Sequence, residues 1–331
     1  MLGSVRYTID RVIHEVKRWK GRVFKILALL VLTAVLGDAT TTVYGQAPDT
    51  FAQASGQATS NFTSQQGMIF LPVRIAGSPQ LNFVLDSGST RTLIDKSVAQ
   101  RLGLKTEEES SLQGAGAGRI PIQAIHDVMI ELPGLQSTHY DCFATDLKPL
   151  ESSLGVRVDG ILGYDFFARF VISVDFEKNV VTIELPSAFH PAQNETVLPI
   201  EIRNKWPFVK ATLKMDGNSP IVDTFFIDSG SSDAVDHPIV KSMQNKTPSK
   251  SGVGLGTPVE GSIATASSFE IGPYVLGGPI VVSCCGASEA TSRLIGTEVL
   301  RRFTVTFDYT SSRLFLRPNG AYRETFRTAQ F

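Results

Sequence analysis

Cysteine, tryptophan and histidine are scarce in this chain, and its charge is low. The 331 residues include 3 cysteines, 2 tryptophans and 5 histidines, and 19% of all residues are charged. Three cysteines are too few for a disulfide framework, and adjacent cysteines such as Cys284 and Cys285 rarely meet the geometry of a comfortable bridge. We therefore expect either one disulfide, to Cys142, or buried free thiols on strands.

The motifs of several other hydrolases are also missing. His14-Glu15 lacks a second histidine three residues further on, so it is no zinc motif, and no G-x-S-x-G segment occurs. The other histidines are scattered singly, which is typical of surface or structural positions. The sequence thus predicts neither a metal nor a cofactor.

No apolar run is long enough to span a bilayer comfortably. The longest, Ile26 to Leu36, has eleven residues and follows a segment, 1–25, with seven Lys or Arg and two acidic residues. Basic residues before a short apolar core predict a signal peptide within residues 1–45, cleaved after Ala39 or Gly45. An uncleaved membrane anchor and a buried helix are the alternatives.

The rest of the chain is mildly acidic. Without residues 1–45, Lys plus Arg falls from 31 to 24 and Asp plus Glu from 32 to 29, which leaves a net charge of −5. This balance argues against nucleic acid as a partner. Residues 46–66 are rich in Gln, Ala, Ser and Thr without a sustained period, so we expect a flexible linker or leader there.

A duplicated motif dominates what remains. The segment Phe83 to Ser89 reads FVLDSGS, and a close copy, FFIDSGS, occupies Phe225 to Ser231, 142 positions later. One Asp-Ser-Gly is ordinary turn chemistry. Two copies, each after an apolar run that predicts a buried strand, deliver Asp86 and Asp228 from two similar loops.

A second pair of segments follows. Ile161-Leu162-Gly163 ends 77 residues after Asp86 and Leu294-Ile295-Gly296 ends 68 residues after Asp228, and from there the two halves align without a gap at an offset of 133. The chain is therefore predicted to be an internal duplication.

Other elements are predicted around these motifs. The first strand begins at Met68, and short helices are expected over residues 97–102 and from Pro238. Each half closes with a hairpin, within residues 170–185 and 303–316. Prolines between Pro186 and Pro199 mark a connector, and the residues after Pro318 are expected to form a loose tail.

The paired motifs resemble those of the aspartic proteases, specifically a two-lobed single chain of the pepsin type whose lobes look like retropepsins. The resemblance covers roughly residues 67 to 318. It implies an all-β fold with two homologous retropepsin-like β-barrel lobes, residues 67–190 and 197–331, and an active site at the lobe interface.

The resemblance also assigns roles to residues. Asp86 and Asp228 would form a catalytic dyad in which one carboxyl keeps a proton and the other is a base. Support for the dyad would come from three residues of each loop: Ser87, Gly88 and Ser89, and Ser229, Gly230 and Ser231. The hydroxyls of Ser87 and Ser229 would cross-link the loops through backbone groups, and the two glycines would allow a tight turn.

Ser89 and Ser231 carry a further expectation. In pepsin-like enzymes a hydroxyl residue at this position donates to the outer oxygen of its aspartate, whereas retropepsins generally have alanine there. Such a donor lowers the pKa of a carboxyl group. The resemblance thus implies a pH optimum on the acid side of neutrality.

Glycine-rich runs follow the first motif in each half. Their glycines are Gly114, Gly116 and Gly118, then Gly252, Gly254 and Gly256. Both flanks predict strands, which does not fit a dinucleotide-binding loop. A mobile hairpin of this kind suits a flap that closes over an extended peptide, or else an ordinary surface hairpin. No tyrosine lies within Leu112 to Ile122, so two glycine-rich tips are closer to the retropepsin arrangement.

The sequence therefore predicts a monomeric aspartic endopeptidase that acts on polypeptides and is exported or tethered to a membrane through its N-terminus. Two alternatives remain open. One is a catalytically silent module that holds an extended peptide by strand-like pairing. The other is a self-processing envelope protein whose only substrate is its own leader.

Overall fold

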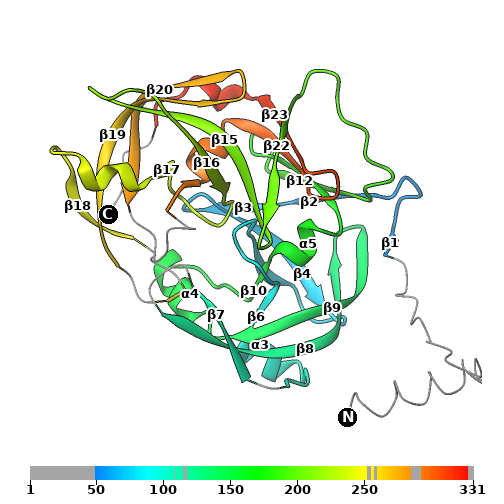
Figure 1. Ribbon diagram of the computed structural model, residues 1–331. Helices are drawn as coiled ribbons and strands as arrows, with labels where there is room; N and C mark the ends of the chain where they lie inside the picture. The colour runs from blue at the N-terminus through cyan, green and yellow to red at the C-terminus, as the bar shows by residue number, and fades with distance from the viewer. Residues whose placement is uncertain are drawn as a thin grey trace, which may run out of the picture. The chain divides into compact units, whose positions relative to one another are not determined.

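The protein folds almost entirely as β-sheet. The computed structural model describes residues 49–107, 109–114, 118–251, 255–256, 259–284 and 292–326, which form three sheets and several short helices (Figure 1). The predicted signal peptide or anchor, residues 1–45, lies outside these residues. Within them, no helix has both the length and the apolar character needed to cross a membrane.

The first sheet closes on itself and forms the N-terminal barrel. Strand β9 pairs with β6, followed around the ring by β10, β5, β4 and β8, and β8 pairs again with β9. Ile69, Leu71 and Val73 of β4 lie in the main hydrophobic core, whereas Met68 and Phe70, also buried, belong to a second apolar cluster. The strands of this sheet are β1 (Thr50–Phe51), β3 (Thr63–Gln65), β4 (Met68–Ile75), β5 (Leu81–Leu85), β6 (Leu93–Asp95), β7 (Glu109–Gln113), β8 (Arg119–Leu132), β9 (Leu135–Thr145) and β10 (Gly160–Leu162).

The C-terminal barrel repeats this order. Strands β15, β16, β21, β17, β20 and β19 take the places of β4, β5, β10, β6, β9 and β8, and β15 pairs with β19 to close the ring. The all-β prediction with barrel-shaped sheets is thus confirmed. The strands here are β14 (Glu201–Arg203), β15 (Trp206–Met215), β16 (Ile221–Ile227), β17 (Val235–Asp236), β18 (Thr247–Ser251), β19 (Val259–Ile271), β20 (Tyr274–Cys284) and β21 (Leu294–Ile295).

A third sheet takes strands from both halves of the chain. Its order is β13 (Thr196–Pro199), β23 (Arg313–Pro318), β22 (Phe303–Asp308), β11 (Val171–Asp175), β12 (Val180–Glu184) and β2 (Gln57–Asn61). The hairpins β11–β12 and β22–β23 are those predicted from the sequence. At the centre Ser173 faces Thr306, and their hydroxyl oxygens lie 2.7 Å apart. These two residues are 133 positions apart, which is the repeat offset of the sequence.

The expectation of a flexible linker over residues 46–66 is wrong for most of those residues that the structure describes. Strands β1, β2 and β3 lie there, and β2 pairs along its whole length with β12. The inward-facing residues of β2 are Ala58 and Ser60, both buried. Because the inner face of β2 holds small residues, the alternation of inward and outward side chains gives no hydrophobic pattern in the sequence. Asp49, just before β1, forms a 2.8 Å ion pair with Arg169.

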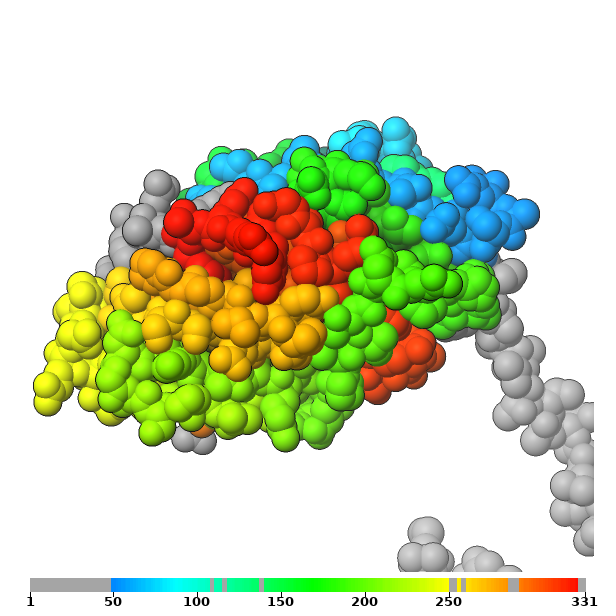
Figure 2. Space-filling model, turned by 90° about the horizontal axis from the view of Figure 1, so that it is seen from above, coloured from blue at the N-terminus to red at the C-terminus, as the bar shows by residue number. Residues whose placement is uncertain are grey.

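The expectation of a loose tail after Pro318 is also wrong for residues 319–326. A 3₁₀ helix, η3 (Gly320–Arg323), follows β23, and Tyr322 donates to the Val275 carbonyl. The fully buried guanidinium of Arg302 donates to the carbonyls of Ala321 and Glu324, and the Phe326 ring lies 3.7 Å from it. In Figure 2 the red C-terminal residues accordingly lie against the orange strands of the C-terminal barrel.

Short helices connect the strands. Both predicted helices are present, and Pro238 lies in the first turn of η1. The helices are α3 (Lys96–Arg101), α4 (Lys148–Leu154), α5 (Tyr164–Phe167), η1 (Pro238–Ser242) and α6 (Thr297–Leu300). Helices α5 and α6 directly follow the two Ile/Leu-Gly segments, so they occupy matching places in the two halves.

The cysteines differ in their states. Cys142 is a free thiol, fully buried in the N-terminal barrel, and its burial raises the pKa of the thiol. The expected bridge to Cys142 is therefore wrong, and the alternative of a buried free thiol on a strand holds for this residue. Cys284 is in a disulfide, and Cys285 lies outside the described residues.

Candidate active site

The two Asp-Ser-Gly loops begin at equivalent strand ends. Asp86 follows β5 and Asp228 follows β16, and each strand lies parallel to the Ile/Leu-Gly strand of its own barrel, β10 or β21. The Asp86 N–H donates to Leu162 O at 3.0 Å, and the Asp228 N–H donates to Ile295 O at 2.9 Å. These main-chain bonds fix where each aspartate leaves its barrel.

Ser87 and Ser229 join the two loops. The Ser87 hydroxyl donates to Ile227 O and accepts from the Ser229 N–H, both at 2.9 Å. The Ser229 hydroxyl makes the mirror-image bonds, to Leu85 O and from the Ser87 N–H, also at 2.9 Å. Both serines are buried, so these four bonds are shielded from water and hold the loops in one relative position.

Gly88 and Gly230 let the opposite carboxyl groups approach. A Cβ atom on Gly88 would lie 2.5 Å from Asp228 Oδ1, and one on Gly230 would lie 2.4 Å from Asp86 Cγ. Neither distance is possible for a real side chain. Close approach across the loop interface therefore requires glycine at both positions, whereas neither residue has the positive φ that would itself favour glycine.

The carboxyl groups of Asp86 and Asp228 contact each other through a side-chain hydrogen bond. Burial raises the pKa of both, and the charge of Asp86 further raises the pKa of Asp228, well above the usual range. Both residues stay partly accessible at the surface. Two adjacent carboxyls that do not readily ionise together, in a place that water can reach, suit paired acid and base chemistry.

The two aspartates receive unequal numbers of donors. Asp86 Oδ1 accepts from the Gly88 N–H at 2.7 Å and from the Ser89 N–H at 3.0 Å. Asp228 Oδ1 accepts from the Gly230 N–H at 2.8 Å. Backbone donors favour the ionised carboxylate. The extra donor therefore favours the ionised form at Asp86 more than at Asp228.

The hydroxyls of Ser89 and Ser231 do not have the expected role. Ser89 Oγ donates to Arg91 O at 2.7 Å, and Ser231 Oγ accepts from the Asp233 N–H at 3.3 Å. The expectation that each hydroxyl donates to its aspartate is wrong for Ser89, whose O–H is used by Arg91 O, and the contact described for Ser231 Oγ is with the Asp233 N–H and not with Asp228. Ser89 serves the carboxyl pair only through its backbone N–H.

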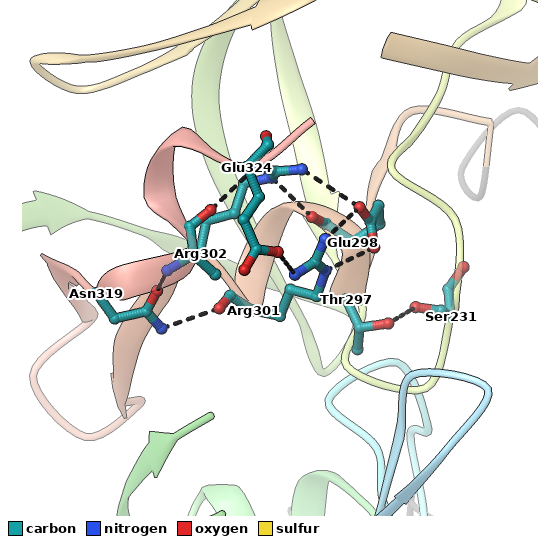
Figure 3. A network of polar contacts seen from close by, with 8 residues as sticks. Ser231, Thr297, Glu298, Arg301, Arg302, Asn319 and Glu324 are labelled. Atoms are coloured by element: carbon teal, nitrogen blue, oxygen red, sulfur yellow. Dashed lines mark hydrogen bonds and ion pairs between the residues drawn. The ribbon is translucent and has the colours of Figure 1, made fainter. Parts of the chain in front are cut away.

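Helix α6 stabilises the Asp228 loop through hydrogen bonds to Ser231. Thr297 Oγ1 donates to Ser231 O at 2.8 Å, and the Thr297 N–H donates to the same carbonyl. Figure 3 shows this contact at one end of a network in which Glu298, Arg301 and Arg302 join α6 to the C-terminal residues. The Asp228 loop is thus connected through α6 to the end of the described chain.

The glycine-rich tips touch each other where they are described. A Cβ on Gly114 would lie 2.3 Å from the Leu255 carbonyl oxygen, and the Leu255 side chain packs against an apolar cluster of the N-terminal barrel that includes Met68 and Phe70. Gly118 and Gly256 have positive φ values that favour glycine. Gly116, Gly252 and Gly254 lie outside the described residues.

Two residues near the pair were missed by sequence reasoning. Tyr309 follows β22 and is buried, and burial, with the charges of Asp86 and Asp228, raises the pKa of its hydroxyl well above the usual range. Trp206 donates from its indole N–H to Gly88 O at 2.8 Å. Aligned with the first half, these positions hold Phe176 and Met68, so a comparison of the repeats could have identified both as changes between the halves.

Metal binding finds no support in the described part of the chain, where no group of three or more His, Cys, Asp or Glu side chains could hold an ion. Residues 71–166 match the aspartyl protease family, a range that includes Asp86 and Gly163 but ends before Asp228. No curated protein matches the chain at a significant level. The family match supports an aspartic peptidase activity.

Proposed function

We propose that this protein is an aspartic endopeptidase, a single chain of two lobes in a pepsin-type arrangement, with Asp86 and Asp228 as its catalytic dyad. The observation that carries the proposal is the meeting of two Asp-Ser-Gly loops, one from each barrel, through the four bonds of Ser87 and Ser229. The family match over the first loop supports the same chemistry. Intact carboxyls in both loops favour catalysis over a silent peptide-binding module, which needs neither.

In the proposed reaction, ionised Asp86 takes a proton from a water molecule while the water oxygen attacks the scissile carbonyl carbon. Protonated Asp228 donates to the carbonyl oxygen, which gives a neutral diol. When the C–N bond breaks, the nitrogen takes the proton from Asp86 and one diol hydroxyl returns a proton to Asp228. The pair thereby regains its starting protonation without a covalent intermediate.

The proposed substrate is an extended polypeptide that lies between the carboxyl pair and the two glycine-rich tips. Contact between Gly114 and Leu255 means that the tips must separate to admit it. We further propose that the enzyme acts as a monomer outside the cytoplasm. Residues 1–45 would be removed as a signal peptide or would hold the enzyme at a membrane.

Asparagine variants test the dyad. Asp86→Asn and Asp228→Asn should each lower peptide turnover at least about 100-fold, because general acid and base catalysis contributes this much or more. The exposed Asp216 provides the control, since Asp216→Asn makes the same chemical change away from the loops and should leave turnover intact. The assay is cleavage of an unfolded protein library, with and without a pepstatin-like inhibitor, after circular dichroism shows unchanged folds. Full turnover by either dyad variant would contradict the proposal, and peptide binding without any cleavage by the wild type would favour the binding module.

A further inference from the structure

The two aspartates have different surroundings although their loops have the same sequence, Asp-Ser-Gly-Ser. The difference begins at the peptide unit between Gly88 and Ser89. Its N–H, on Ser89, donates to Asp86 Oδ1 at 3.0 Å, and its C=O, on Gly88, accepts from the Trp206 indole at 2.8 Å. One peptide unit thus connects an indole donor to the carboxylate.

Trp206 reaches this peptide from the opposite barrel. It is the first residue of β15 and follows a hairpin tip, Asn204-Lys205, whose residues both have positive φ. Lys205 Nζ lies 3.4 Å from Asp165 Oδ1 and 5.0 Å from the Tyr164 ring centroid, on α5 of the N-terminal half. The half-buried Trp206 ring packs against Phe226 at 5.5 Å between centroids. Lys205 therefore fixes the hairpin tip, and Phe226 supports the indole ring itself.

The matching hairpin of the first half lacks this donor. Its tip is Gln66-Gly67, also with positive φ, and the next residue is Met68. Met68 pairs with Gln65 as Trp206 pairs with Arg203, so the two residues occupy the same position of their hairpins. A methionine side chain has no N–H to offer to the Asp228 loop. Asp228 Oδ1 correspondingly accepts from the Gly230 N–H and has no counterpart of the Ser89 bond.

We propose that Trp206 is a positioning residue for Asp86: its indole N–H orients and polarises the Gly88–Ser89 peptide, so that Asp86 carries the charge of the pair and Asp228 the proton. A hydrogen bond at the carbonyl strengthens the N–H donor of the same peptide. A stronger donor favours the ionised carboxylate. The inference rests on the proposed dyad and gives a reason why Asp86 is the ionised member and Asp228 the protonated one.

One other charged group near the pair acts in the same direction as the indole, because the charge of Asp233 raises the pKa of Asp228. Asp228 faces Asp86 directly, Tyr309 is buried near both carboxyls, and Asp233 acts on Asp228 from the same loop. Two cations flank the Asp86 loop, Arg91 and Lys205, and both pair with Asp165. The indole N–H is uncharged over the whole working pH range, so its influence does not depend on its own titration.

The test replaces the N–H and keeps the ring. Incorporation of 3-benzothienylalanine at position 206 exchanges the indole N–H for sulfur at nearly constant shape, and Trp206→Phe removes both the N–H and the bicyclic ring. In both variants the acidic limb of kcat/KM against pH should move upward by roughly 0.5 pH unit, because the ionised form of Asp86 loses support. Phe226→Leu is the matched control, since it disturbs the packing of the indole and keeps the donor; its acidic limb should stay in place.

A second readout needs no substrate. Carbon-13 NMR of the aspartate carboxyls, in the full chain, should show Asp86 titrating at higher pH in the benzothienylalanine protein than in the wild type. The role of Trp206 would be overturned if neither the acidic limb nor the Asp86 titration moved in the Trp206 variants. It would also be overturned if both moved equally in Phe226→Leu. A wild-type protein that cleaves no peptide would overturn the proposed function instead, while the NMR titration still decides whether the indole sets the charge.

Discussion

Gly88 and Gly230 are the residues whose identity the carboxyl pair constrains most directly. Each backbone passes so close to the opposite aspartate that any side chain would displace the carboxyl group. The duplicated motif predicted a tight turn at both positions. It could not predict the contact across the interface, because that contact depends on how two loops far apart in sequence face each other.

Gly230→Ala should lower kcat at least about 100-fold while the protein stays folded, because its Cβ would push the Asp86 carboxyl out of reach of water and of Asp228. Gly277→Ala is the control, since a Cβ there meets nothing within 4 Å. Kinetics and circular dichroism of both variants are compared with the wild type. An active Gly230→Ala enzyme would mean that the carboxyls need not approach so closely.

The hydroxyls of Ser89 and Ser231 give a second prediction at this scale. Replacing both with alanine should leave the acidic limb of kcat/KM within about 0.3 pH unit of the wild type, because neither hydroxyl hydrogen bonds to an aspartate. The resemblance to pepsin-like enzymes implied an upward shift. Measurement of the pH profile separates the two, and a clear upward shift would restore the role first expected for these hydroxyls.

Individual elements were predictable where their pattern was strong. The strands before the motifs, the closing hairpins and helix α3 all carry apolar periodicity or clear boundary residues, and the structure has them. Strand β2 and the C-terminal residues were missed for a physical reason. Their contacts use small side chains, backbone carbonyls and the buried guanidinium of Arg302, which leave no hydrophobic period in the sequence.

Removal of the residues after Pro318 should destabilise the protein by about 3 to 5 kcal/mol, because the Arg302 guanidinium loses two of its hydrogen bonds and each bond to a charged group contributes about 1.5 to 3 kcal/mol. Arg302 would lose the Ala321 and Glu324 carbonyls and the cover of Phe326. Glu324→Gln keeps the carbonyl and weakens the half-exposed pair with Arg301, so it should cost at most about 1 kcal/mol. Urea unfolding of both variants measures the difference. Equal stabilities would show that the C-terminal residues are dispensable.

The molecule as a whole is joined by one sheet and one pair of loops. Strands β11 and β22 pair at the centre of the third sheet, and Ser87 and Ser229 connect the ends of β5 and β16. The repeat offsets in the sequence predicted which residues correspond. They could not say that corresponding residues such as Ser173 and Thr306 would face each other, since the pairing of the two halves leaves no trace in either half alone.

The two barrels differ at a buried position of equivalent strands, β6 and β17. Asp236 on β17 occupies the position of the buried Ile94 in the first half. It is 4% exposed, and within the described residues its Oδ1 has no hydrogen-bond partner. Burial, and then the charge of Asp233, raise the pKa of Asp236 well above the usual range. The folded state therefore holds the proton more tightly than the unfolded state does.

The raised pKa of Asp236 predicts how stability changes with pH. The contribution of the protonated carboxyl is complete below its unfolded pKa, near pH 4, and is lost as pH rises through the folded value. Asp236→Asn cannot ionise, so at pH 7 to 8 it should be more stable than the wild type by about 1 to 3 kcal/mol, while the two proteins should be similar at pH 4. Urea unfolding across this range, with Asp216→Asn as the exposed control, measures the effect. The prediction would be contradicted if the free energies of unfolding of Asp236→Asn and the wild type differed by the same amount at every pH. Ionisation of Asp236 would then not destabilise the fold, and contacts of the carboxylate itself would support its burial.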